Sequence, residues 1–301
     1  MSIQANELDH KIKNKTLQTN TEWIPLIEKN KINCTTIAIT SGKGGVGKTN
    51  FSLNFALSLK QINKEVLLVD ADLGLANIDI LLGITPNLTL SKYFSDNLSL
   101  KDIIYKGPER LNILPAKNGL ENIANLSENQ LIKFIKDFSE LELYYDYIIF
   151  DTSAGIRIQT TSFVLSSKEC FVLITPEPTS IVDAYSMIKI IVKKQPAKTI
   201  NIIVNMAKSE QEAITTFNNV AELAKKFLKK TLFFYGYLPY DNDVIKAVKS
   251  QVPVLQLNNN SKFSKNLLSI RDNWLSKQNF NKKISFGERF VKFFKNTKDL
   301  I

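Results

Sequence analysis

A glycine-rich segment near the start of the chain constrains the fold more than any other feature. Residues 42–49 read Gly-Lys-Gly-Gly-Val-Gly-Lys-Thr, which fits the pattern G-x-x-x-x-G-K-[ST]. The β-branched run Thr36–Thr40 precedes it, and a helix-like pattern from Asn50 to Lys60 follows. Glycines in such a strand–loop–helix unit let backbone N–H groups converge on an anion at the helix N-terminus. The segment therefore predicts a phosphate-binding loop.

Short apolar runs recur along the chain and predict the strands of one sheet. They are Thr36–Thr40, Val66–Val69, Leu111–Leu114, Tyr147–Phe150, Phe171–Ile174, Ile202–Val204 and Leu232–Leu238. Most are continuously apolar rather than alternating, which is typical of strands buried on both faces of a parallel sheet. Helical patterns such as Glu212–Leu228 separate them. We therefore expect an α/β fold with a doubly wound, mostly parallel sheet of the phosphate-loop type.

Composition divides the chain into three parts. Residues 1–33 form a polar N-terminal extension, residues 34–276 carry the strand and helix patterns, and residues 277–301 form a basic, aromatic tail. No run of about 18 apolar residues and no secretory signal occurs, so we expect a cytoplasmic protein. The two cysteines, Cys34 and Cys170, and the single histidine, His10, give no disulfide framework, zinc site or histidine-based triad.

The tail carries the pattern of a basic amphipathic helix. Its helical stripe consists of Phe286, Phe290, Phe293 and Phe294, and its basic residues are Lys282, Lys283, Arg289, Lys292, Lys295 and Lys298. Such a helix over 284–298 suits an anionic membrane surface, where each basic residue contributes about 1 kcal/mol. The same stripe also suits a helix packed on the protein's own core, and the sequence leaves both readings open.

The residue types of the loop assign its contacts with a nucleotide. Lys48 would reach the β- and γ-phosphates, and the Thr49 hydroxyl would ligate Mg²⁺. The residues whose backbone would surround the phosphates are Gly42, Gly44, Gly45, Val46 and Gly47, with Asn50 opening the following helix. The alternative is a glycine-rich turn without a ligand.

Aspartates follow two of the predicted strands. Asp70 and Asp72 follow the second strand, and Asp151 follows the fourth. Ligands of open α/β sheets lie at the carboxyl ends of strands, and a phosphate loop needs carboxylates to hold Mg²⁺ and position water. We therefore expect Asp151 at the metal, and Asp70 and Asp72 on the same side of their extended segment. The alternative role for Asp70 or Asp72 is to cap the N-terminus of a helix.

The string Lys-Gly-Gly-x-Gly-Lys-Thr resembles the deviant phosphate loop of the MinD/ParA family of ATPases, whose members dimerise over ATP. The resemblance implies slow, regulatory ATP hydrolysis. It implies that Lys43 crosses the dimer interface to the partner's phosphates, that Asp72 orients the attacking water, and that Asp70 lies near Mg²⁺. Without that role, Lys43 would be a solvated loop lysine.

The same resemblance implies a site for the base. Asn205, which ends the sixth strand, would read the adenine edge, because an amide both donates and accepts hydrogen bonds. Pro239 and Asp241 would flank the base. The alternative for Asn205 is a residue that caps a turn. The sequence has no guanine-reading Asn-Lys-x-Asp string, which favours ATP over GTP.

Longer strings are similar to the FlhG group (also called YlxH or FleN), the MinD-like regulators of flagellar number and placement. They are residues 67–79 (LLVDADLGLANID), 175–185 (TPEPTSIVDAY), 205–206 (NM) and 236–241 (GYLPYD). The resemblance implies an ATP-bound homodimer that associates peripherally with the membrane and returns to the cytosol after hydrolysis. Its candidate partners are an FlhF-like GTPase and flagellar switch (C-ring) proteins. Of the group's N-terminal activating segment, only Gln4, Ala5 and Leu8 match.

Three other functions compete with this one. A MinD-type ATPase of the cell-division site would share the same motifs. A ParA-type DNA-partitioning ATPase would use the formal net charge of +10 to bind DNA, but the phenylalanine stripe argues against DNA as the partner. A scaffold that binds nucleotide without hydrolysing it is the third, and the intact Lys48, Thr49, Asp72 and Asp151 argue against it.

Overall fold

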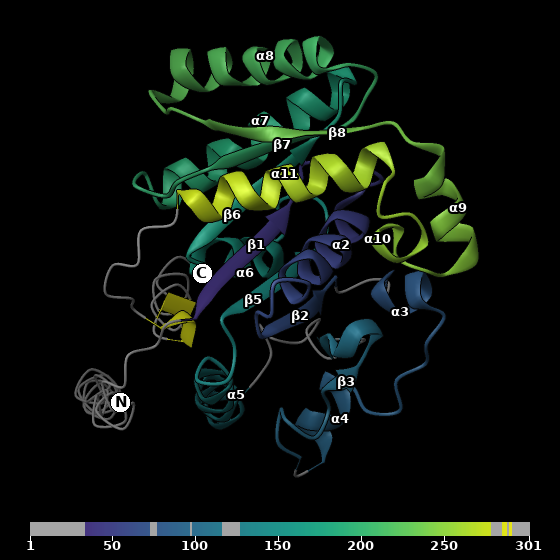
Figure 1. Ribbon diagram of the computed structural model, residues 1–301. Helices are drawn as coiled ribbons and strands as arrows, with labels where there is room; N and C mark the ends of the chain where they lie inside the picture. Colours follow the sequence, from purple (N-terminus) through teal and green to yellow (C-terminus); the bar gives the residue numbers. More distant parts are fainter. Residues whose placement is uncertain are drawn as a thin grey trace, which may run out of the picture. The chain divides into compact units, whose positions relative to one another are not determined.

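The computed structural model describes residues 34–72, 77–96, 98–115, 127–277, 285–287 and 289–290. Their strands form one eight-stranded sheet in the order β3-β4-β2-β5-β1-β6-β7-β8 (Figure 1). The strands are β1 (Thr35–Thr40), β2 (Val66–Ala71), β3 (Tyr105–Lys106), β4 (Asn112–Leu114), β5 (Tyr147–Thr152), β6 (Glu169–Ile174), β7 (Asn201–Ala207) and β8 (Phe233–Pro239). The expected extension over residues 1–33 lies outside the described residues.

The pairing of the strands confirms the expected doubly wound, mostly parallel sheet. Every neighbouring pair is parallel except β3 and β4, which are antiparallel. The seven strands expected from apolar runs are all present. The additional strand is β3, whose two residues are too few to show any periodicity.

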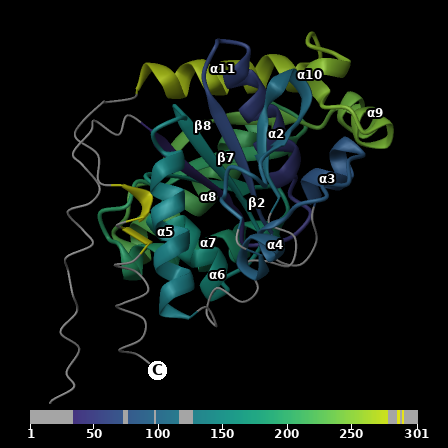
Figure 2. The same ribbon diagram turned by 90° about the horizontal axis from the view of Figure 1, so that it is seen from below.

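Helices cover both faces of the sheet. Helices α2 (Lys48–Lys60), α10 (Val254–Leu257) and α11 (Lys262–Ser276) lie on one face, and α5 (Glu128–Leu141), α6 (Ile158–Ser166), α7 (Pro178–Lys194) and α8 (Glu210–Leu228) on the other (Figure 2). The remaining short helices are α3 (Asn77–Leu82), α4 (Leu90–Ser95), η2 (Pro108–Arg110) and α9 (Asn242–Ser250).

The central strands supply side chains to two hydrophobic clusters. All residues of β1, β2 and β5 are buried, as their unbroken apolar runs predict. In β1, Ile37 and Ile39 pack with Phe51 and Phe55 of α2, whereas Ala38 faces the cluster of α6, α7 and α8. This alternation follows from the two-residue period of a strand. The glycine-rich loop begins where β1 ends, at Thr40.

The described part of the tail packs on the protein. Phe286 and Phe290 are 1% and 0% exposed, and their rings contact phenylalanines of α5, α6 and β5. Of the two readings that the sequence leaves open, packing on the core is the one that this structure shows for these two side chains. The predicted membrane contact of the tail stays a prediction, and Phe293 and Phe294 lie outside the described residues.

Candidate active site

The glycine-rich loop joins the end of β1 to the start of α2. At two of its positions, neighbouring atoms leave no room for a Cβ atom, so that glycine is required. A Cβ atom on Gly42 would lie 2.0 Å from the backbone carbonyl carbon of Asp183 in α7. Gly47 has a φ of 88°, and a Cβ there would lie 2.3 Å from the side-chain nitrogen of Asn205. The loop is therefore held against α7 and β7 by contacts that any larger residue would prevent.

The N-terminus of α2 points out of this loop. Among the described residues, no side chain caps the helix at Gly47, and no acidic side chain occupies its first turn. The first-turn N–H groups of a 13-residue helix carry a partial positive charge that attracts anions. Together with the loop backbone, they offer N–H donors to an anion, and phosphate binding at this loop stays a prediction.

Lys48 is the first residue of α2 and places a buried ammonium group at the end of the glycine-rich loop. Its side chain is 8% exposed, and its Nζ atom donates a hydrogen bond to the Ser41 hydroxyl at 2.9 Å. Burial lowers the pKa of Lys48, while the nearby carboxylates of Asp151 and Asp72 raise it. A buried ammonium whose hydrogen-bond acceptor among the described residues is a neutral hydroxyl is suited to a further anionic partner.

Asp151 ends β5 beside the start of α2. Its Oδ1 atom accepts a hydrogen bond from the Ser52 hydroxyl at 2.8 Å, and the Thr49 side chain also bonds to this carboxylate. Burial raises the pKa of Asp151 to about 6, and the hydrogen bonds from Ser52 and Thr49 oppose that rise. The other oxygen, Oδ2, is buried and has no hydrogen-bond partner among the described residues.

These oxygen atoms fit a magnesium ion. The unpaired Oδ2 of Asp151 and the hydroxyl of Thr49 are hard oxygen ligands of the kind that Mg²⁺ prefers. In the described part of the chain, no group of three or more histidine, cysteine, aspartate or glutamate side chains is arranged to hold a metal. Such a group is not needed, because Mg²⁺ at phosphate loops takes one or two protein ligands besides phosphate and water.

Asp70 and Asp72 lie where the sequence expects them, at the end of β2 next to β5. Asp70 is paired in register with Asp151, and burial followed by the charge of Asp151 raises its pKa well above its ordinary value. Its carboxyl group accepts hydrogen bonds from the backbone of Asp72 at 3.2 Å and of Ile78 at 3.4 Å. Asp72 accepts a hydrogen bond from the Asn77 side chain at 3.0 Å. The roles of both aspartates in hydrolysis stay predictions.

Lys43 extends from the loop towards α7. Its Nζ atom lies 2.6 Å from the Glu177 carboxylate and 3.0 Å from the Thr179 hydroxyl. The side chains of the ion pair are 39% and 62% exposed for Lys43 and Glu177. The lysine is thus on the surface at the mouth of the loop, where its proposed reach towards a partner remains a prediction.

Asn205 is used by the loop in this structure. Its side-chain nitrogen donates to the Val46 carbonyl oxygen at 2.7 Å, and its side-chain oxygen accepts from the backbone of Met206 at 2.9 Å. The residue is 5% exposed, so its amide links β7 to the phosphate loop. The predicted role at the adenine edge is not tested by these contacts.

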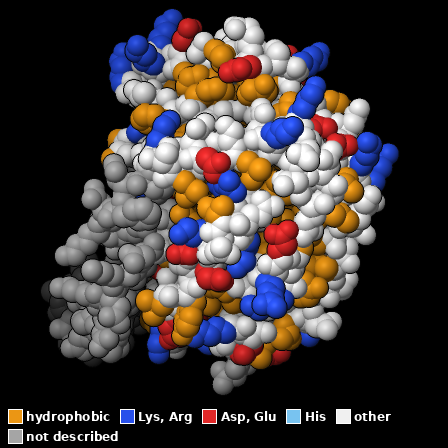
Figure 3. All heavy atoms as spheres, viewed as in Figure 1, with side chains coloured by type: hydrophobic (Ala, Val, Ile, Leu, Met, Phe, Trp, Pro, Cys, Tyr) orange, Lys and Arg blue, Asp and Glu red, His pale blue; other side chains and the backbone are white. Residues whose placement is uncertain are grey.

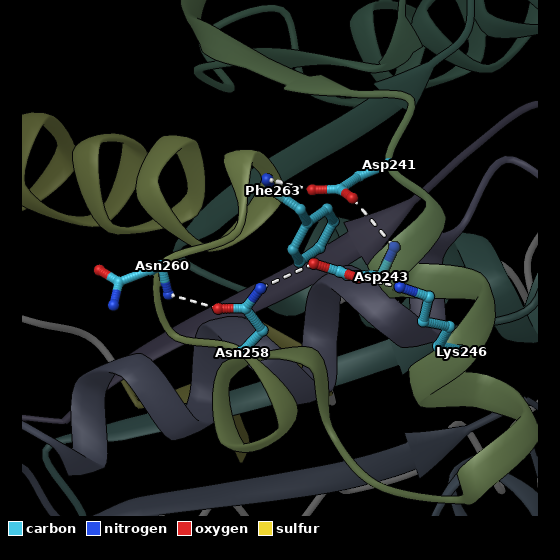
Figure 4. A network of polar contacts seen from close by, with 6 residues as sticks. All are labelled: Asp241, Asp243, Lys246, Asn258, Asn260 and Phe263. Carbon is cyan, nitrogen blue, oxygen red and sulfur yellow. Dashed lines mark hydrogen bonds and ion pairs between the residues drawn. The ribbon is translucent and has the colours of Figure 1, made fainter.

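Asp241 connects the loop after β8 to two helices, as Figure 4 shows. One carboxylate oxygen accepts from the backbone of Asp243 at 2.9 Å and the other from the backbone of Phe263 at 3.0 Å. Asn258 and Lys246 both donate to Asp243, at 2.7 Å and 3.0 Å.

Asp241 therefore caps α9 and fixes the start of α11, while Pro239 pairs with β7 at Ala207. A role of Asp241 and Pro239 at the base stays a prediction.

Two residues of this site were not foreseen from the sequence. Ser52 lies one helical turn after Thr49 on α2, a spacing that placed it on the same face of the helix. Glu177 belongs to the string 175–185. It is 134 residues from Lys43 in the sequence, and the fold places its carboxylate against the lysine. Its acidic charge next to a proline at a helix start was the available signal.

Comparison with known proteins identifies relatives of known role. A family model described as an AAA domain matches residues 34–230. The antiactivator FleN of Pseudomonas aeruginosa is 40% identical over 228 residues, which cover 76% of this chain and 81% of that protein. The flagellum site-determining protein YlxH of Helicobacter pylori is 31% identical over 279 residues, 92% of each chain.

The solved structures agree with the fold. The septum site-determining protein MinD of Pyrococcus horikoshii, in complex with Mg-ADP, matches with a TM-score of 0.65 and 26% identity. The match covers 81% of this chain and 96% of that one. No helix among the described residues has the length and apolar character needed to cross a membrane.

Proposed function

Because the chain belongs to the FlhG group of the MinD/ParA family of ATPases, we propose that it regulates flagellar number or placement by an ATP-driven cycle. In this cycle, two copies pair over ATP, bind the membrane, and separate after hydrolysis. The single observation that carries the proposal is the convergence of Lys48, Thr49 and Asp151 at the carboxyl edge of the sheet. The relatives named for flagellar roles supply the biological setting.

The chain's own residues perform the proposed hydrolysis mainly by positioning. The loop amides and Lys48 hold the phosphates, and Asp72 orients the attacking water. Thr49 and Asp151 would hold Mg²⁺, which supplies positive charge where negative charge develops on the phosphate oxygens. The hydrolysis acts as a slow timer that sets how long the ATP-bound form lasts.

Exposed apolar residues near the loop support the proposed pairing of two copies. Ile156 and Ile158 are 54% and 48% exposed, and they follow Gly155, whose N–H donates to the Ser41 carbonyl at 3.0 Å. Val182 is 60% exposed beside the α7 backbone that contacts the loop. Exposed apolar side chains near the loop that carries Lys43 suit an interface with a second copy, whose phosphates that lysine would reach.

The proposed membrane contact is the tail over 284–298, with a peripheral rather than a spanning attachment. Pairing two weak helices in one dimer would raise the avidity for an anionic bilayer, so ATP would control membrane binding. We further propose an FlhF-like GTPase and flagellar switch (C-ring) proteins as partners, on the strength of the group alone.

Binding to DNA is the competing function, and the net charge of +10 is the observation that favours it. On the face drawn in Figure 3, however, lysine and arginine side chains are interspersed with acidic and apolar ones rather than gathered in one stripe. A DNA-binding face of this family's partitioning members would need a concentrated basic surface.

Co-sedimentation tests the proposal against its competitor. The full chain is incubated with Mg-ATP or Mg-ADP, and either phosphatidylglycerol-containing vesicles or duplex DNA. We expect ATP-dependent binding to the vesicles, together with release of phosphate in a separate hydrolysis assay. ATP-dependent binding to DNA without binding to vesicles would replace this function by partitioning.

A further inference from the structure

Helix α3 donates hydrogen bonds from its first turn to both aspartates at the end of β2. The Asn77 side chain donates to the Asp72 carboxylate at 3.0 Å, and the Ile78 N–H donates to the Asp70 carboxylate at 3.4 Å. The Ile78 side chain is fully buried in the hydrophobic cluster that includes α2. The position of α3 therefore decides where these donors meet the two carboxylates.

The other end of α3 is held by Gln251, the residue that follows α9. Its side-chain nitrogen donates to the Ile80 carbonyl oxygen at 3.0 Å, although the two residues are 171 positions apart. A Cβ atom on Gly83 would lie 2.7 Å from the Gln251 side-chain oxygen, so this side chain lies directly against the turn that ends α3. Figures 1 and 2 both show α3 beside α9. A helix of six residues has few internal hydrogen bonds, so contacts from outside fix its position.

The backbone of Gln251 adopts a conformation that favours glycine. Its φ of 54° and ψ of 36° are left-handed, and its N–H donates to the carbonyl oxygens of Ala247 and Val248 at the end of α9. Glycine is the usual residue at such a helix end, because a side chain there carries a conformational cost. Among the described residues, the side chain of Gln251 hydrogen-bonds only to α3. This contact is the feature that glycine could not supply.

Helix α9 connects this contact to the opposite side of the candidate active site. The helix begins at its cap Asp241, two residues after Pro239, in the loop that is predicted to flank the base. It ends at Gln251, against the helix that donates to Asp72. One rigid element thus extends from the predicted base loop to the support of the water-orienting carboxylate.

We propose that Gln251 is a positioning residue for ATP hydrolysis, which acts through α3 to hold the Asp72 carboxylate in place for the attacking water. The inference rests on the proposed role of Asp72 and adds a residue outside the phosphate loop. Because Gln251 contacts α3 rather than that loop, its loss slows the chemical step without weakening nucleotide binding.

Replacing Gln251 by glycine separates this role from a role in stability. Gln251→Gly removes the contact but suits the left-handed backbone, so Tm should stay within about 2 °C of wild type. We expect kcat for phosphate release from Mg-ATP to fall about fivefold, while KM stays within about twofold. Gln256→Ala is the matched control, since this exposed glutamine donates to Glu109 at 3.4 Å, and it should keep the wild-type kcat.

Two results of this comparison would overturn the positioning role. One is a wild-type kcat in Gln251→Gly. The other is a loss of kcat that Gln256→Ala shares, or that is matched by a loss of Tm, because either pattern would point to general destabilisation.

A second variant displaces the same side chain from the α3 side. Gly83→Ala places a methyl group 2.7 Å from the Gln251 side-chain oxygen, so it should lower kcat in the wild-type background. In the Gln251→Gly background it should cause no further loss, because the contact is already gone. Equal losses in the two backgrounds would show that Gly83 and Gln251 act separately, which contradicts the proposal.

Hydrogen exchange tests the contact without relying on hydrolysis. In the nucleotide-free full chain, backbone amides of residues 77–83 should exchange about threefold faster in Gln251→Gly than in wild type or Gln256→Ala. Unchanged exchange would overturn the inference. A wild-type chain that releases no phosphate from Mg-ATP would instead overturn the proposed function, and the exchange rates would still decide whether Gln251 holds α3.

Discussion

Lys43 and Glu177 form an ion pair of 2.6 Å that connects the phosphate loop to the start of α7. Both side chains are substantially exposed, at 39% and 62%, so solvent screens their attraction. Exposed pairs of this kind contribute about 0–1 kcal/mol to stability. The lysine is therefore free to exchange its partner at little cost, as a role towards the phosphates of a second copy requires.

Replacing each member of this pair separately distinguishes the contribution of the lysine's charge to dimerisation from the contribution of the ion pair. Lys43→Ala should abolish ATP-dependent dimerisation while nucleotide binding to the monomer stays within about threefold of wild type. Glu177→Gln breaks the same ion pair but keeps the cation, and should retain dimerisation. Light scattering with Mg-ATP measures both. Loss of the dimer in Glu177→Gln to the same extent would mean that the pair, rather than the lysine alone, builds the interface.

The Ser52 hydroxyl should set the orientation of the Asp151 carboxylate. Ser52→Ala removes the 2.8 Å bond to Oδ1, so the magnesium concentration for half-maximal ADP binding should rise about tenfold. Ser58→Ala is the matched control, since this buried hydroxyl on the same helix donates only to the Phe55 carbonyl oxygen, at 2.7 Å. Titration of a fluorescent ADP analogue with Mg²⁺ gives the readout. Equal magnesium dependence in the two variants would remove Ser52 from the site.

Burial of Asp151 should make the nucleotide-free protein lose stability as the pH rises. Its folded pKa of about 6 exceeds the unfolded value of 3.8, so the folded state binds more protons between these values. The contribution of Asp151 to the free energy of unfolding is therefore fully present below pH 3.8 and is lost as the pH rises through about 6. The loss is on the order of 2–3 kcal/mol. Asp151→Asn should raise Tm more at about pH 7 than at about pH 5 without Mg²⁺. A gain that is the same at both pH values would contradict the shifted pKa.

The close approach of Gly42 to α7 should make alanine costly there. A Cβ atom would meet the Asp183 backbone at 2.0 Å, and backbone cannot rotate away. We expect Gly42→Ala to cost roughly 2 kcal/mol, or about 5 °C in Tm. Gly44→Ala is the control, since a Cβ there has nothing within 4 Å. Scanning calorimetry of both variants without nucleotide decides, and similar Tm values for the two would show that the loop is not pinned against α7.

The sequence predicted the sheet because its strands are buried on both faces, which forces unbroken apolar runs such as Ile148–Phe150. It also placed Lys48, Thr49 and Asp151 together, because the carboxyl ends of parallel strands share one edge. The strand β3 was missed since its two residues owe their conformation to pairing with β4 rather than to their own pattern.

The remaining contacts depend on distances along the chain that local patterns do not encode. Ser52 meets Asp151 across 99 residues, and a serine inside a helix carries no signal of its own. The phenylalanine stripe of the tail predicted an apolar partner but not which one. For Phe286 and Phe290, the partners in the structure are the rings of Phe138 in α5 and Phe163 in α6.

The mass of Asp72→Ala in solution tests the central claim most directly, namely that this site binds and hydrolyses ATP between two copies. Without the carboxylate that orients water, hydrolysis should stop and the ATP-bound pair should persist. Light scattering should give twice the chain's 34.1 kDa with Mg-ATP and 34.1 kDa with Mg-ADP. A mass of 34.1 kDa in both nucleotides, or phosphate release at the wild-type rate, would contradict the account.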